Sequence, residues 1–258
     1  MSISSSARWF AAVALAALVV AGCGDDEAEP TPPPSLTETA ATTAPEPTAT
    51  PTTTPAPPTP TPWGTPGPDN TIVVACGEIL APLDKTHRLT PDCVPPDLEA
   101  LPAEMVASAG QLLRRDAAAA YRELFAAARA DGYTIVAASA YRNYQEQVSA
   151  YTSHVNRGGQ AYADRVSARP GHSEHQLGTT TDVSSATAGY GLESFEGTAE
   201  AAWLAEHSWE YGFIVSYPEG KEPITGYVYE PWHIRWVGKD EAAKVRASGL
   251  TLHEYLLR

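Results

Sequence analysis

The sequence predicts an α+β fold for one domain that spans residues 71–258, about 190 residues. Residues 104–130 are rich in Ala, Leu, Arg and Glu and carry apolar residues at helical spacing. Residues 133–139 and 179–183 are short apolar or β-branched runs that are typical of strands. A long helix followed by interleaved strands favours α+β, and this length suffices for one hydrophobic core.

The remaining elements are predicted from similar patterns. Residues 83–98 are punctuated by proline and lack periodicity, so we expect them to pack along the surface of the domain. The other predicted elements are a strand at 72–75, helices at 145–155 and 199–211, a strand at 224–229, and short helices at 240–248 and 252–257.

Residues 1–22 resemble a lipoprotein signal peptide. Arg8 supplies a positive charge, residues 10–20 form an apolar core, and small residues precede Cys23. We expect cleavage before Cys23, lipidation of its thiol, and an exported protein anchored to the membrane and facing the cell wall. An uncleaved membrane anchor is the alternative, although the apolar run is shorter than the ~20 residues that span a bilayer.

Residues 23–70 are dominated by Pro and Thr and have few apolar residues to bury. This composition predicts a disordered tether between the membrane and the domain. Cys76 and Cys93 remain as an even pair that an oxidising compartment would join in a disulfide. A zinc site on these cysteines is the alternative, but no Cys-x-x-Cys spacing supports it.

The formal net charge of −14 argues against a nucleic-acid partner, because no basic footprint is present. An acidic surface of this kind is typical of a soluble, solvated domain. The sequence leaves the oligomeric state open, and our working expectation is a monomer.

Two short motifs carry groups that can bind a metal. The run Ser-Glu-His-Gln-Leu-Gly-Thr-Thr-Thr-Asp contains His175 and ends at Asp182, and the run Glu-Pro-Trp-His extends from Glu230 to His233. Two imidazoles and one carboxylate can hold zinc and leave its fourth position for water. Glu230 is then free to act as a base. Taken singly, His175 and Asp182 are better explained as a surface histidine and a helix or turn cap.

The spacing within each motif makes a geometric demand. His175 and Asp182 are an odd number of residues apart, so an unbroken strand would point them to opposite faces. A turn at Gly178 must therefore bring them together. Pro231 has to bend the second motif in the same way.

Arg142 follows the predicted strand 133–139 and offers a planar fork for a carboxylate or an oxyanion. A structural salt bridge is the alternative for this residue. Ser173 and Ser139 can contact a substrate or serve as turn residues. The other histidines have no partner at suggestive spacing, and we interpret them as surface or structural residues.

Four motifs occur in a fixed order and together resemble the VanY-type D-alanyl-D-alanine carboxypeptidases. The similarity extends over most of residues 83–240. The motifs are Ser-Ala-Tyr-Arg-Asn-Tyr-x-x-Gln (139–147), Ala-Arg-Pro-Gly-His-Ser-Glu-His-Gln-Leu-Gly (168–178) with Asp182, Tyr-Gly-Phe to Tyr-Pro-Glu-Gly-Lys (211–221), and Thr-Gly-Tyr-x-Tyr-Glu-Pro-Trp-His-x-Arg (225–235).

The resemblance implies a single zinc D,D-carboxypeptidase domain of the Hedgehog/DD-peptidase-like fold, with one Zn²⁺. It implies that Glu230 is the catalytic base and that Arg142 is an electrostatic partner of the substrate. By the same resemblance, Ser173 and Gln147 are expected to line the substrate pocket. The implied zinc ligands are His175, Asp182 and His233.

The implied reaction is removal of the terminal D-Ala from peptidoglycan stem peptides by Glu-assisted attack of a zinc-bound water. An L,D-carboxypeptidase that acts on tetrapeptides is the nearest alternative. A wall-binding lipoprotein without activity and a purely structural zinc domain are further alternatives, and the presence of Glu230 and of only three ligands disfavours them.

Three positions depart from the family pattern. Ala140 replaces a usual Gly, Thr180 replaces a common Ala, and Ser216 replaces a frequent Arg before the Tyr-Pro pair. None of these residues is an expected ligand, so the departures bear on the shape of the pocket rather than on metal binding.

Overall fold

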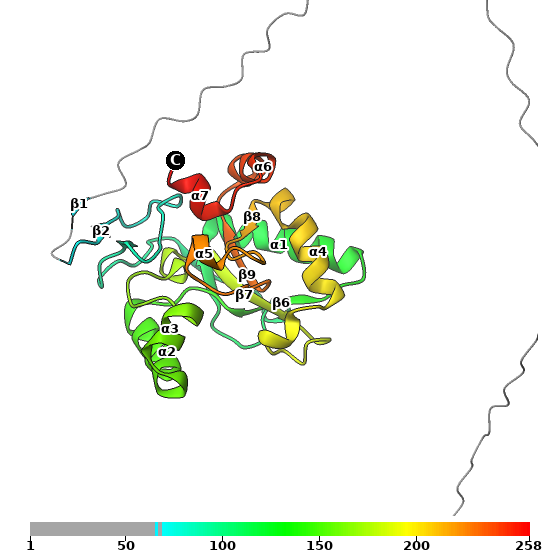
Figure 1. The fold of residues 1–258 in the computed structure, drawn as a ribbon. Helices are drawn as coiled ribbons and strands as arrows, with labels where there is room; N and C mark the ends of the chain where they lie inside the picture. Colours follow the sequence, from blue (N-terminus) through cyan, green and yellow to red (C-terminus); the bar gives the residue numbers. More distant parts are fainter. Residues whose placement is uncertain (1–64, 67–68) are drawn as a thin grey trace, which may run out of the picture. The chain divides into compact units, whose positions relative to one another are not determined.

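A four-stranded antiparallel sheet, in the order β6-β7-β9-β8, forms the centre of the computed structural model, which describes residues 65–66 and 69–258 (Figure 1). The described residues belong to one compact unit. The strands are β1 (Thr65–Pro66), β2 (Ile72–Val73), β3 (His87–Arg88), β4 (Leu98–Ala100), β5 (Leu112–Arg114), β6 (Ile135–Ser139), β7 (Thr180–Ser185), β8 (Phe213–Val215) and β9 (His233–Trp236).

Helices and 3₁₀ turns cover the sheet, in agreement with the predicted α+β class. The α-helices are α1 (Arg115–Ala130), α2 (Tyr144–Gly158), α3 (Gln160–Val166), α4 (Ala199–His207), α5 (Glu222–Thr225), α6 (Lys239–Ser248) and α7 (Leu252–Leu256). The 3₁₀ turns are η1 (Ala103–Met105), η2 (Glu174–Leu177), η3 (Glu193–Phe195) and η4 (Ser208–Tyr211).

The predicted signal peptide 1–22, the lipidation site Cys23 and most of the predicted tether 23–70 lie outside the described residues. Within the described part of the chain, no helix is long and apolar enough to cross a bilayer.

One face of the central sheet is apolar and packs against α1 and α4. Tyr121 and Leu124 of α1 are fully buried together with Val183 of β7 and Ile234 of β9. Leu204 of α4 completes this cluster. Since side chains alternate along a strand, the neighbours Asp182 and His233 point to the opposite face. The apolar core therefore places the candidate ligands on one side of the sheet.

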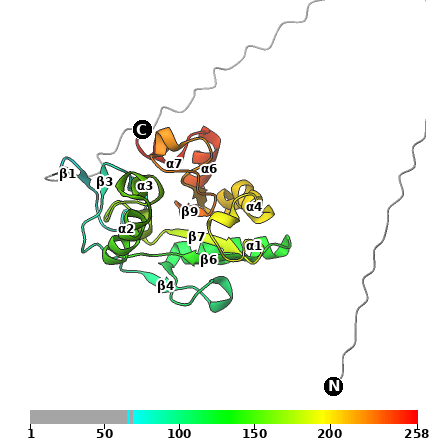
Figure 2. The same ribbon diagram turned by 60° about the horizontal axis from the view of Figure 1, so that its bottom comes forward.

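Helices α2 and α3 pack against each other at a distance from α1 and α4 (Figures 1 and 2). Helix α2 begins with a capping box, in which the Asn143 side chain accepts from the Glu146 N–H and the Glu146 carboxylate accepts from the Asn143 N–H. This cap ends the loop 140–143 at a defined place and so fixes Arg142 next to the sheet.

The segment 83–98 packs along the surface of the domain, as expected, with buried residues interspersed among exposed ones. Leu83 and Leu89 are buried with Leu177 of η2, and the disulfide between Cys76 and Cys93 closes the segment. The disulfide agrees with the prediction from the cysteine count. The buried leucines have a structural role, because Leu83 and Leu89 pack in one cluster with Leu177 of η2.

The predicted helix 104–130 starts later than expected. Gly110 adopts a φ of 92°, which interrupts helical structure, and Leu112–Arg114 forms β5 paired with β4. The pattern of apolar residues did not separate a strand of three residues from the helix that follows it directly.

The predicted strand 224–229 is wrong. Glu222–Thr225 is a helical turn, with Pro223 in its first turn and Gly226 at its C-terminus with a φ of 76°. Proline at the start and glycine at the end favour a helical turn over a strand. The strand that carries the second motif is instead β9, which begins at His233.

Replacement of Gly178 by Ala tests the turn between the two ligands. Gly178 has a φ of 72°, and an added Cβ would lie 2.9 Å from Leu98 Cδ2 and 3.0 Å from Arg114 Cγ. Gly132→Ala is the matched control, because Gly132 has a φ of 90° and no atom within 4 Å of an added Cβ. We expect Gly178→Ala to lower the free energy of unfolding by about 1–3 kcal/mol more than the control, because of overpacking. Equal losses in urea denaturation would contradict this.

Candidate metal centre

Three buried side chains meet on the polar face of the sheet. Ligand atoms of His175, Asp182 and His233 all lie within 4.8 Å of one another. Asp182 is at the centre, with Oδ2 3.3 Å from His175 Nε2 and Oδ1 3.1 Å from His233 Nδ1. Burial alone would raise the pKa of Asp182, but the charges and hydrogen bonds of the two histidines lower it well below its usual range.

The bends that the spacing demanded are present. His175 lies in η2, and Gly178 in the left-handed conformation turns the chain into β7, which carries Asp182. Asp182 and His233 are direct partners in the antiparallel pair of β7 and β9, so their side chains share one face. The turn from Glu230 to His233 is closed by a hydrogen bond from the His233 N–H to the Glu230 carbonyl, at 3.2 Å.

Each histidine has one ring nitrogen engaged and the other directed at Asp182. His175 Nδ1 lies 2.7 Å from the Ala140 carbonyl, and only a protonated nitrogen can donate there. Its Nε2 therefore keeps a free lone pair. His233 Nε2 lies 2.9 Å from Oε2 of Glu174, and its Nδ1 faces Asp182 Oδ1 at 3.1 Å. Burial alone would lower the pKa of His233, but these two carboxylates raise it to about 10. Hydrogen bonds of this kind orient histidine ligands in metal sites.

Glu174 is a functional residue that the sequence analysis missed. Its carboxylate accepts from His233, from the Ser216 hydroxyl at 2.6 Å and from Arg235 Nη1 at 2.8 Å. Burial would raise its pKa, but the Arg235 charge and these hydrogen bonds lower the pKa to about 2. Nothing in its position directly before His175 distinguished it, because its partners are Ser216, which follows β8, and two residues of β9.

Glu230 stands apart from the other two carboxylates of the site. Its Oε2 lies 3.6 Å from His233 Nδ1, and no closer ion pair holds it among the described residues. Burial raises its pKa to about 8, against the opposing charge of His233. A buried carboxyl group with a raised pKa can exchange a proton near neutral pH, as a general base must.

A cavity of about 230 Å³ opens beside the three candidate ligands and Glu230. Arg142 lines it, with Nη2 3.9 Å from Asp182 Oδ2 and with a buried Nε that has no hydrogen-bond partner in the described region. An unpartnered guanidinium N–H inside a cavity is suited to a carboxylate or an oxyanion of a ligand.

Two of the other three predicted pocket residues line the cavity, and one does not. Ser173 and Gln147 line the cavity. Ser173 also accepts a hydrogen bond from the His175 N–H, and the Gln147 amide nitrogen donates to the Ala168 carbonyl. Ser139 lies opposite Asp182 on β6 but is not among the residues that line the cavity.

Several cavity residues were not predicted individually. His154 lines the cavity, although we had interpreted it as a surface or structural residue. Tyr217, Tyr227 and Trp232 also line it. Their positions depend on the long segment between β8 and β9, whose path no local pattern revealed.

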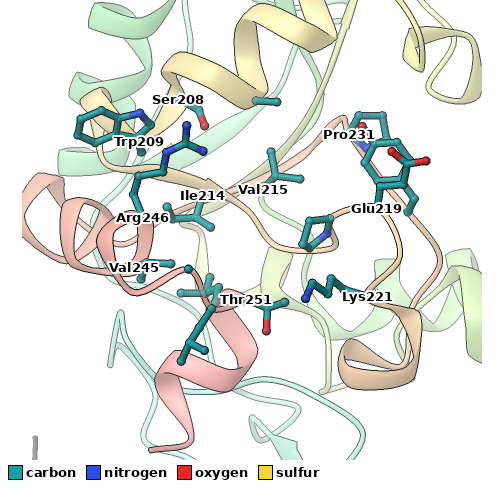
Figure 3. A pocket seen from close by; sticks show the side chains of 16 residues that line it. Ser208, Trp209, Ile214, Val215, Glu219, Lys221, Pro231, Val245, Arg246 and Thr251 are labelled. Atoms are coloured by element: carbon teal, nitrogen blue, oxygen red, sulfur yellow. The ribbon is translucent and has the colours of Figure 1, made fainter. Parts of the chain in front are cut away.

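A separate cavity of about 390 Å³ lies behind the segment that carries Glu230. Figure 3 shows Trp209 and Arg246 on one side of it and Glu219 and Pro231 on the other. It contains none of the predicted site residues, and its lining is mainly apolar. The chemistry described above is therefore confined to the cavity with the candidate ligands.

The donor set fits Zn²⁺. Two imidazole nitrogens and one carboxylate oxygen form the three-ligand pattern of catalytic zinc sites, and the second nitrogen of each imidazole already has an oxygen partner that can orient the ring.

Comparison with known proteins agrees with this geometry. The family model VanY, D-alanyl-D-alanine carboxypeptidase, matches residues 110–239. The chain belongs to the VanY family.

Individual relatives extend this result. The putative carboxypeptidase YodJ of Bacillus subtilis is 40% identical over 69% of this chain, and the match covers 66% of YodJ, slightly less than two thirds. A structure of the LdcB LD-carboxypeptidase, described for its peptidoglycan recognition, is 37% identical and has a TM-score of 0.67, covering 72% of this chain and 90% of LdcB. A mutant of the vancomycin-resistance D,D-pentapeptidase VanY in complex with Zn(II) is 31% identical, with a TM-score of 0.58 and coverage of 69% and 98%.

Glu174→Gln tests the support of His233. Glutamine keeps the size of the side chain, but its amide N–H can face His233 Nε2 and favours the tautomer with the proton on Nδ1. We therefore expect zinc affinity, measured by competition with a chelator, to fall about 10–100-fold.

Ser216→Ala is the control for this substitution, because it removes a neutral donor to Glu174 and leaves the acceptor for His233 in place. The free energy of unfolding without metal is measured for both variants, since Glu174→Gln also deprives buried Arg235 of its charged partner. Unchanged zinc affinity of Glu174→Gln would contradict the role of Glu174.

Proposed function

We propose that this protein is a zinc carboxypeptidase that hydrolyses the C-terminal D-Ala from peptidoglycan stem peptides ending in D-Ala-D-Ala. The main support is the isolated, buried carboxyl group of Glu230 next to His175, Asp182 and His233, within a cavity that also contains Arg142. Membership of the VanY family supports the same reaction.

In the proposed reaction, His175, Asp182 and His233 hold the zinc ion. When bound, zinc supplies Lewis-acid polarisation of the scissile carbonyl and acidifies a nearby water. Glu230 accepts the proton of the attacking water on its carboxylate and delivers it to the amine of the departing D-Ala. Arg142 neutralises the terminal carboxylate of the substrate or the developing oxyanion.

The same proposal includes the location of the enzyme. The N-terminal sequence supports an exported monomer that is anchored through a lipid on Cys23 and that reaches the wall by the tether of residues 23–70. Its stem-peptide substrates lie in that compartment.

An L,D-carboxypeptidase that removes D-Ala from tetrapeptide stems is the second candidate. The higher TM-score of LdcB, 0.67 against 0.58 for the D,D-pentapeptidase VanY, favours it. Release of D-Ala from a pentapeptide and from a tetrapeptide, measured side by side, separates the two candidates.

Glu230→Gln tests the proposed base. We expect kcat/KM for D-Ala release to fall by about 10²–10⁴-fold, because the amide cannot accept the proton, while zinc content stays unchanged. Removal of zinc with a chelator should abolish activity, and added zinc should restore it.

Glu219→Gln is the control for the loss of one carboxylate, since Glu219 lines the separate cavity of Figure 3. Full activity of Glu230→Gln would refute the mechanism.

A further inference from the structure

A third cavity, polar and of about 860 Å³, adjoins the metal cavity. Tyr227 lines both cavities. The segment 164–170 also borders both, because Val166 to Ala168 line the metal cavity, while Asp164 and Arg169 line the polar one. The two cavities therefore lie side by side along Tyr227 and the segment 164–170.

The polar cavity contains a lysine without a counter-ion. Lys85 Nζ lies 3.4 Å from the centroid of the Tyr227 ring and donates to the Asp164 carbonyl, but it forms no ion pair with any described carboxylate. Burial lowers its pKa to about 8, even though nearby acids, Glu230 among them, oppose the change. Its side chain is still exposed enough for a ligand to reach.

The neighbouring acidic side chains do not neutralise the charge of Lys85. Arg169 occupies both carboxylate oxygens of Asp164, at 2.9 Å each. Arg88 also lines the cavity, and its Nε lies 3.6 Å from Asp69 Oδ2. Three cations thus face two acids in this cavity, in a chain whose net charge is −14. The local excess of positive charge is suited to an anionic ligand.

The boundary between the two cavities offers a second unused group. Tyr227 is only 3% exposed, and its hydroxyl has no hydrogen-bond partner within the described part of the protein. A buried hydroxyl that lacks a partner is destabilising. A ligand bound next to Tyr227 would supply that partner.

The direction of the ligand follows from the proposed reaction, on which this inference rests. The residue that a carboxypeptidase releases is the end of the substrate chain. Only the acyl part, on the other side of the scissile bond, continues outward from the metal cavity. The polar cavity is then a place for groups of the acyl part.

We infer that the polar cavity is a subsite for a carboxylate on the acyl part of the substrate, with Lys85 as its cationic partner and the Tyr227 hydroxyl as a further hydrogen-bonding group. The substrate class is a peptide that carries a free carboxylate upstream of its terminal D-Ala. A γ-linked glutamate is such a residue, because its α-carboxylate stays free, and amidation removes the charge with little change in shape.

Two peptides test the inference, L-Ala-γ-D-Glu-L-Lys-D-Ala-D-Ala and its counterpart with γ-D-isoglutamine. We expect the protein to favour the free carboxylate about tenfold in KM, with similar kcat, as for one charged hydrogen bond at a partly exposed site. Lys85→Gln should bring the first peptide to the KM of the second. Lys221→Gln is the control, because Lys221 lines the separate cavity of Figure 3.

Binding of both peptides to the Glu230→Gln variant, measured as Kd by calorimetry, separates this inference from the proposed reaction. A tenfold difference in Kd that Lys85→Gln removes supports the subsite even if no D-Ala is released. Equal Kd values, or an equal loss for both peptides in Lys85→Gln, overturn it and assign Lys85 a structural role. Failure of both peptides to bind overturns the proposed substrate and this subsite together.

Discussion

The pairing of β7 with β9 is the constraint on which the site depends. It sets Asp182 opposite His233, and the adjacent pair of Thr181 and Ile234 on the apolar face. A slip of one residue would turn His233 toward the core and Ile234 toward the cavity, so burial of Ile234 and Val183 against α1 holds the register. The geometry of the metal centre is thus stabilised by hydrophobic packing on the far side of the same strands.

Burial of charge divides the three carboxylates of the site into two kinds. Glu174 and Asp182 each contact cationic or hydrogen-bonding partners at 3.3 Å or less, and their pKa values fall despite burial. Glu230 lacks such partners, and its pKa rises. A carboxylate that is already paired is a poor proton acceptor, whereas an isolated one gains stability from a proton. The difference in pairing therefore supports Glu230 as the proposed base.

The sequence revealed the parts of the site that lie within short motifs. Gly178 and Pro231 predicted the bends within the two motifs, because local backbone conformation depends on local residues. Glu174 could not be recognised, since its partners come from strands about forty or more residues away. The strand expected at 224–229 failed for a local reason instead, because Pro223 and Gly226 favour a helical turn there.

Ser216 is a departure from the family pattern that we expected to bear on the shape of the pocket, but it contacts Glu174 next to the candidate metal centre instead. Its hydroxyl donates to the same Glu174 oxygen that accepts from His233 Nε2. An arginine at this place would add a second cation beside a carboxylate that Arg235 already pairs with, and so draw electron density away from the acceptor. A neutral hydroxyl donor draws less electron density from the Glu174 carboxylate than an arginine would. Glu174 therefore stays a stronger acceptor for the His233 N–H, which would make Nδ1 a more basic ligand for a bound metal.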